Sequence, residues 1–217
     1  MTGRSSECRA GGADAQAAGE REARRQWLQA ALLVGVLLVG ALGAARIAGA
    51  EELRVPPRLQ AELLAKVAAY DTKFSQRARG RALVLVVSAP KVADSERFAA
   101  QIRAELAKQP RIGGVEHMED NVRFSTAAEL ARVCRERRPA VVYLAPGLSD
   151  AVPSIAHELA GLDVLSVSAV PGDVPSGIVL GFEVVSGRPR LLVNLPRARQ
   201  QNVAFMPELL RLARVTL

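Results

Sequence analysis

The spacing of hydrophobic positions changes along this chain, and each spacing predicts a different kind of element. Two short runs are apolar without alternation, at 82–87 ("ALVLVV") and 140–144 ("AVVYL"). Such runs are typical of strands that helices bury on both faces, so both are expected inside a parallel sheet. Residues 164–170 predict a further strand, and residues 115–118 a short extended piece.

The segments between these strands carry apolar residues every three or four positions, which is the spacing of one helix face. A first helix is expected to begin at Pro56, with one apolar stripe made by Leu59, Leu63, Val67 and Tyr70. The next is expected to begin at Asp94, as its N-cap, and to end at Pro110. Its inward side carries Phe98, Ile102 and Leu106.

Two more helices follow. Thr126-Ala-Ala-Glu129 predicts a capping box, in which the hydroxyl and the carboxylate each satisfy a free backbone N–H at the helix start. Ser149-Asp150 is interpreted as the cap of the second helix, and Gly161 as its stop. Its inward residues are expected to be Val152, Ile155, Ala156 and Leu159.

A β-hairpin is predicted where two apolar segments flank Ser186-Gly187, a two-residue turn. The turn sets the register, because a slip would lose several cross-strand pairs together. Pro189 has no N–H to donate, so the second strand is expected at the sheet edge. The expected opposite pairs are Phe182 with Leu191, Leu180 with Val193, Ile178 with Leu195, and Glu183 with Arg190.

Two closing helices are expected after the hairpin, because Pro196 and Pro207 suit a first helical turn. Strands separated by helices of this length imply right-handed crossovers. The predicted fold is therefore a three-layer α/β sandwich, with a mostly parallel sheet, a C-terminal antiparallel hairpin and closing helices. One domain is expected over residues 51–217.

Residues 1–50 are interpreted as an export signal. An uncharged apolar run at 30–45 follows five arginines, and the small residues Ala48 and Ala50 form an A-x-A cleavage site. Two alternatives stay open: export by the twin-arginine route, through Arg24-Arg25, and an uncleaved membrane anchor. In each case the folded part is expected outside the cytoplasm, in the periplasm.

Composition and charge narrow the class of protein further. With 49% hydrophobic and 24% charged residues the chain is globular, and its net charge is +7. A basic protein in the periplasm can meet anionic lipid or an acidic protein surface, whereas nucleic acid is excluded as a partner there. Because Cys8 lies in the removed segment, Cys134 is left alone and is expected to be buried. Pairing of Cys134 between chains, and a homodimer, stay open.

Few residues offer catalytic or metal-binding chemistry. His117 and His157 are the two histidines, and neither has a supporting motif for a nucleophile or a metal. No phosphate-binding glycine loop occurs, so we expect no enzyme, no metal and no cofactor. The loops 88–94 and 145–150 border the crevice where open α/β sheets bind ligands, which keeps a small-ligand receptor as the alternative function.

Arginines are dense after the hairpin turn. Arg188, Arg190, Arg197 and Arg199 are the candidate partner-binding residues, with Arg211 and Arg214 beyond them. A cation near a helix N-terminus, as predicted for Arg197, is unfavourable unless an anion is nearby. An acidic partner surface would supply that anion. The other interpretation is a solvated basic face on which Glu183 satisfies Arg190.

The segment "GIVLGFEVVSGRPRLLVNLPRARQQNVAFMPELLRLARV" resembles the closing block of YfiR-like proteins. It has a Gly-hydrophobic-Gly-Phe strand, a turn, a strand ending in Asn-Leu, an Ala-Arg helix and a final Leu-rich helix. Upstream, "VVYLAPG" resembles the middle strand of the family and its loop. Asn194 and Gly181 match positions with a structural role.

The resemblance implies a periplasmic α/β regulator that binds the sensory part of an inner-membrane signalling protein. That partner is a diguanylate cyclase or a sensor kinase, and repressing the cyclase lowers cyclic-di-GMP and biofilm formation. Two features depart from the family. Residues 51–217 cannot form an internal disulfide, and "DTKFSQRARGR" replaces an aromatic-Pro segment, which indicates a divergent branch.

Overall fold

Seven strands form one sheet in the order β2-β1-β3-β4-β5-β6-β7. The computed structural model describes residues 54–217. Strands β1 to β5 are parallel, β6 is antiparallel to β5, and β7 is parallel to β6. The strands are β1 Arg81–Ser88, β2 Glu116–Arg123, β3 Val141–Leu144, β4 Leu165–Ser168, β5 Leu180–Val185, β6 Arg188–Asn194 and β7 Ala213–Thr216.

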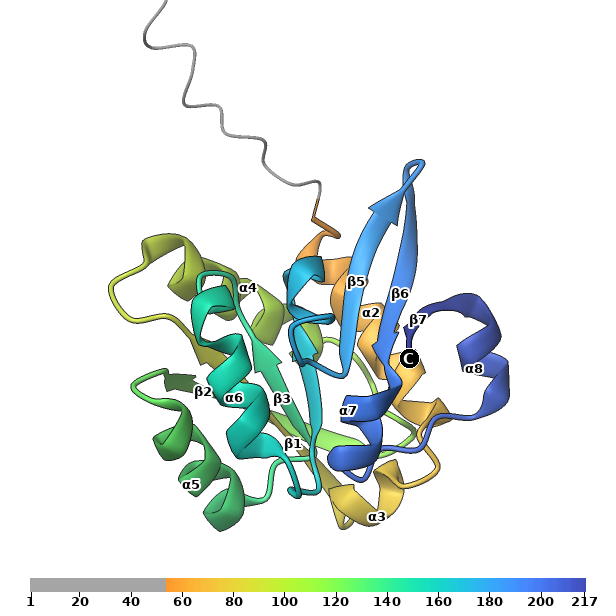
Figure 1. Cartoon of the computed structure of the whole chain (residues 1–217), viewed down its shortest axis with the longest axis horizontal. Helices are drawn as coiled ribbons and strands as arrows, with labels where there is room; N and C mark the ends of the chain where they lie inside the picture. Colours follow the sequence, from red (N-terminus) through yellow and green to blue (C-terminus); the bar gives the residue numbers. More distant parts are fainter. Residues whose placement is uncertain (1–53) are drawn as a thin grey trace, which may run out of the picture. The chain divides into compact units, whose positions relative to one another are not determined.

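Helices cover both faces of the parallel part of the sheet (Figure 1). On one face Val84 and Tyr143 pack against α2 and α4, and on the other Leu85 and Leu144 pack against α5 and α6. The predicted three-layer sandwich is confirmed. The α-helices are α2 Pro57–Val67, α3 Phe74–Ala78, α4 Ala93–Ala107, α5 Ala127–Arg137, α6 Val152–Leu159, α7 Leu195–Gln200 and α8 Pro207–Leu212; the 3-10 turns are η1 Ala68–Tyr70, η2 Ser149–Ala151 and η3 Pro171–Asp173.

Helix α2 faces the core with a stripe shifted by about one position from the predicted one: Val67 is buried as predicted, while Leu59 and Leu63 are only partly buried against the core. Its buried residues are Gln60, Ala61, Leu64 and Val67, while Tyr70 is 38% exposed. The helix is rotated because Gln60 turns inward: its Nε2 donates to the carbonyl of Val55 at 2.7 Å, and its Oε1 accepts from the hydroxyl of Tyr143. The prediction did not include this polar contact, which places Gln60 on the buried side of the helix.

The predicted helix caps are confirmed only in part. The hydroxyl of Thr126 accepts from the backbone N–H of Glu129 at 3.1 Å, but the Glu129 carboxylate binds Arg132 instead of closing the capping box. Asp94 lies inside α4, whose N-cap is Val92. Ser149 begins η2 and makes no side-chain cap bond. By contrast, α6 buries the four apolar residues that its spacing predicted.

The hairpin of β5 and β6 has the predicted register. Leu180 pairs with Val193, Phe182 with Leu191, and Glu183 with Arg190, although Ile178 and Leu195 lie outside the two strands. Ser186 and Gly187 both have positive φ, at 50° and 74°. This is the backbone of a type I′ turn, whose twist matches the twist of the flanking strands.

The last residues form a strand, which corrects the predicted edge position of β6. β7 pairs in parallel with β6 from Leu191 to Asn194, so β7 takes the edge of the sheet. Pro189 is still compatible with β6, because it lies beyond the four residues that β7 covers. On α8, Leu209 is buried against the core, whereas Leu212 is 73% exposed and does not close over it.

The basic loop after α2 folds around a buried arginine. The side chain of Arg77, on α3, is 2% exposed and pairs with Asp71 at 2.6 Å and with Asp163 at 2.8 Å. Its third contact is to the carbonyl oxygen of Asn202, at 2.9 Å. One guanidinium group therefore joins α3 to two segments far away in the sequence.

The export interpretation, with Ala48 and Ala50, lies outside the described residues. From residue 54 onward, every helix is too short or too polar to cross a membrane.

Candidate functional site

The β5–β6 hairpin extends beyond the parallel sheet, and its tip holds two of the candidate arginines (Figure 1). Residues 186–190 are exposed, so Arg188 and Arg190 both reach solvent. The paired strands hold the backbone of these arginines in place. The hairpin therefore offers two cations on a backbone of defined geometry.

Alternation along the strands places both arginines on one face of the hairpin, together with Glu183. β7 adds Arg214 to this face, because Arg214 Nη1 lies 3.5 Å from Glu183 Oε2. Glu183 thus pairs with Arg214, and the predicted Glu183–Arg190 ion pair does not form, although the two residues lie opposite each other. Arg190 is left available on the exposed face.

A shallow pocket adjoins this face. Its volume is about 220 Å³, and Glu183, Leu192 and Arg214 form one side of it. The Oε1 atom of Glu183 is buried and has no hydrogen-bond partner within residues 54–217.

Arg197 and Arg199 lie on α7, at the other end of β6. From Arg188 to Asn194 the strand rises roughly 20 Å, at about 3.3 Å per residue. Arg197 Nη1 donates to Gln200 Oε1 at 2.7 Å, and Arg199 is exposed. The structure therefore gives two arginine pairs, one at the hairpin tip and one on α7, and it brings Arg214 beside the first.

Asn194 and Gly181 have structural roles, in line with their place in the resembling segment. The Oδ1 of Asn194 accepts from the N–H of Arg197 at 3.1 Å and caps α7, while its Nδ2 donates to the carbonyl of Val174 at 2.8 Å. A Cβ atom on Gly181 would lie 2.5 Å from Val174 Cγ2. Only glycine lets this segment approach β5 so closely.

The crevice at the carboxyl ends of β1 and β3 is the topological switch point, since the strand order reverses there. Its two loops pack against each other. The N–H of Ala89 donates to Ser95 Oγ at 2.8 Å within the first loop. The second loop contacts the first closely, since a Cβ on Gly147 would lie 3.4 Å from Ala89 Cβ and 3.5 Å from Val92 Cγ1. This packing gives no support to a ligand site between the two loops.

Comparison with known proteins gives the family. A family model described as DUF4154, YfiR/HmsC-like, matches residues 57–214, from α2 to β7. The chain belongs to the YfiR/HmsC-like family. Members of this family are periplasmic regulators of diguanylate cyclase signalling that interact with a membrane signalling protein. No curated protein matches the sequence significantly.

Two solved structures share the fold of this YfiR/HmsC-like chain. One is a conserved domain protein from Vibrio cholerae O1 biovar El Tor str. N16961, with a TM-score of 0.50, 13% identity, and coverage of 75% of this chain and 60% of that chain. The other is the ligand-free, open form of CD0873, a substrate binding protein with adhesive properties from Clostridium difficile, with a TM-score of 0.50, 10% identity, and coverage of 66% and 57%. The chain spans about 60% of the length of these proteins, and the likeness concerns the fold alone.

YfiR-like proteins are regulators rather than enzymes, and the titratable residues here have structural environments. His117 lies between the Glu119 carboxylate and the carbonyl of Gln109. Burial raises the pKa of the Cys134 thiol to about 12, which keeps it protonated and unreactive near neutral pH. No group of three His, Cys, Asp or Glu side chains in the described part of the chain could hold a metal ion.

Proposed function

We propose that this protein is a non-enzymatic periplasmic regulator that binds the sensory part of an inner-membrane diguanylate cyclase. Holding the cyclase inactive would lower cyclic-di-GMP and biofilm formation. The observation that carries this proposal is the family match over residues 57–214. The exposed arginines of the hairpin support the proposed means of contact.

The proposed contact is the basic face of the hairpin. Arg188 and Arg190 are exposed, and Arg214 lies on the same face beside Glu183. An acidic partner surface would pair with these cations, speed the encounter and fix the register of the two proteins. Arg197 and Arg199 form a second proposed contact at the far end of β6.

The proposed mechanism needs no covalent step. A regulator that binds only the inactive state of a cyclase shifts the population toward that state, by as much as its affinities for the two states differ. An outside signal that weakens this contact releases the cyclase. Capture of the partner and cyclic-di-GMP concentration should therefore change in opposite directions.

Charge reversal of each arginine pair tests this contact. In cells, crosslinking and capture of the membrane partner should fall at least tenfold for Arg188→Glu with Arg190→Glu, because two attractive charges become repulsive. Arg197→Glu with Arg199→Glu should also weaken capture. Cyclic-di-GMP should rise in both strains, while Tm stays within about 2 °C of the parent.

The matched control is Arg58→Glu with Arg97→Glu, two exposed arginines on α2 and α4 with side chains 80% and 66% exposed. It makes the same change in net charge and should leave capture unchanged. Equal capture by all three double variants would remove the arginine surface from the proposal.

A further inference from the structure

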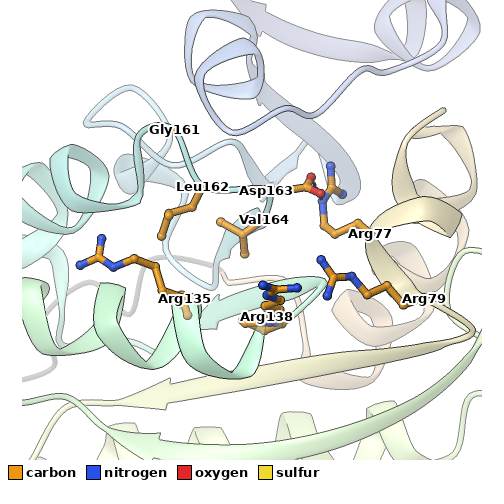
Figure 2. Close-up of a pocket in the computed structure, with 10 residues that line it drawn as sticks. Arg77, Arg79, Arg135, Arg138, Gly161, Leu162, Asp163 and Val164 are labelled. Atoms are coloured by element: carbon orange, nitrogen blue, oxygen red, sulfur yellow. Dashed lines mark hydrogen bonds and ion pairs between the residues drawn. The ribbon is translucent and has the colours of Figure 1, made fainter.

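A pocket of about 350 Å³ lies at the amino ends of β3 and β4. It is therefore at the opposite end of the strands from the switch point. The end of α5, the segment after α3 and the loop before β4 surround it (Figure 2). A volume of this order fits a small molecule. The residues that line the pocket indicate which kind of ligand it would bind.

The charged lining is strongly positive, with four arginines against one aspartate. Arg77 is already paired with Asp71 and Asp163 and is almost fully buried. Asp163 also accepts from Asn202 Nδ2 at 3.3 Å. The single carboxylate of the pocket is therefore engaged, and it leaves the other arginines without a counter-charge.

Arg79 and Arg138 are the two arginines that converge on the mouth of the pocket. Figure 2 shows their guanidinium groups next to each other, below the Arg77–Asp163 pair, while Arg135 lies beside Leu162. Within residues 54–217 neither Arg79 nor Arg138 makes an ion pair or a side-chain hydrogen bond. The two guanidinium groups repel each other, and an anion bound between them would attract both.

The backbone at both arginines is unusual for this residue type. Arg79 is the C-cap of α3 and Arg138 the C-cap of α5, with φ of 51° and 50° in the left-handed region. Glycine is the usual residue at such positions, because it has no Cβ to strain. Arginine at both positions places two cations at one pocket, where glycine would give the less strained turn.

The remaining lining is apolar. Leu162, Val164 and Pro139 form part of the wall, and the buried Cys134 contributes to it. A ligand that matches this lining has a compact apolar body and one oxyanion group. Arginine suits such a group because its planar N–H donors match the oxygens of a carboxylate or a phosphate.

We propose that this pocket binds a small organic anion whose carboxylate or phosphate group contacts Arg79 and Arg138. The inference goes beyond the proposed function, and its test needs no membrane partner. A failure here would therefore leave the hairpin proposal standing, and the reverse also holds.

The test is calorimetric titration of the purified full chain with three probes: inorganic phosphate, benzoate and the neutral analogue benzamide. We expect saturable binding of at least one anion below about 10 mM, and no binding of benzamide. Binding of phosphate alone, or of benzoate alone, would identify the head group that the arginines prefer. Absence of binding for both anions, or equal binding of benzamide and benzoate, would overturn the proposal.

Two variants locate the binding. Arg79→Gln with Arg138→Gln should weaken anion binding at least tenfold, whereas Arg58→Gln with Arg97→Gln removes the same charge elsewhere and should not. Arg79→Gly with Arg138→Gly should also abolish binding, and its Tm should not fall, because glycine adopts the left-handed backbone without strain. Retained affinity in either pocket variant would show that the anion binds somewhere else.

Discussion

At the scale of single residues, a series of buried hydrogen bonds joins α2 to the centre of the sheet. Tyr143 is fully buried on β3, and burial raises the pKa of its hydroxyl, which keeps it a donor. It donates to Gln60 Oε1, and Gln60 Nε2 donates to the carbonyl of Val55 at 2.7 Å. These bonds set the rotation of α2 about its axis.

We expect Tyr143→Phe to destabilise the protein by about 1–3 kcal/mol, because it leaves Gln60 Oε1 buried without a donor. Urea unfolding would measure this as a lower midpoint with an unchanged slope. Adding Gln60→Leu removes the orphaned acceptor, so the double variant should lose less than the two single losses added together. Strict additivity would contradict the proposed coupling.

At the scale of elements, Arg77 connects three segments that no local pattern joins. It contacts Asp71 before α3, Asp163 before β4, and the backbone of Asn202 after α7. Asp71 Oδ1 also accepts from the N–H of Ala204 at 3.0 Å. The loop after α2 is thus a structural junction, and it also forms one side of the pocket between the ends of α3 and α5.

Replacing Arg77 by Met should cost about 3–5 kcal/mol, because the fully buried Asp71 carboxylate would lose its counter-ion. Thermal unfolding provides the measurement. The control Arg58→Met breaks an exposed pair with Glu62 and should cost at most about 0.5 kcal/mol. Similar losses in the two variants would mean that the buried pair adds little to stability.

At the scale of the whole molecule, the family assignment agrees with the proposed export of the folded part. The family model begins at residue 57, shortly after the proposed cleavage site at Ala48 and Ala50. Cleavage there would release a chain that begins at Glu51 and retains every described element. The arginines of the hairpin tip and those of α7 would then both face the periplasm.

Mass spectrometry of the protein from periplasmic extracts should give the mass of residues 51–217. Ala48→Leu with Ala50→Leu should retain the uncleaved mass, because the cleavage site requires small residues. Arg24→Lys with Arg25→Lys distinguishes the two export routes, since it should block only the twin-arginine route. An intact N-terminus in the parent protein would favour the membrane anchor.

Several features of the fold could be predicted from the sequence alone. The sandwich of layers, the α6 face and the hairpin register were predicted correctly, because each depends on contacts between residues close in sequence or on a simple apolar period. The sequence also showed that arginines are dense after the hairpin turn. The sequence could not place Arg214 beside Glu183, or Arg79 and Arg138 at one pocket, because these contacts depend on which distant segments lie side by side in the folded chain.

Only the tertiary structure decided the features that depend on distant partners. β7 was not predicted: the leucine-rich segment forms only the short helix α8, and residues 213–216 then pair with β6 on a distant part of the chain. The Arg77–Asp163 pair joins residues 86 positions apart, and the pocket brings together the ends of α3 and α5. The physical reason is the same in each case: burial and charge pairing act across space, and they override local preference wherever the chain folds back on itself.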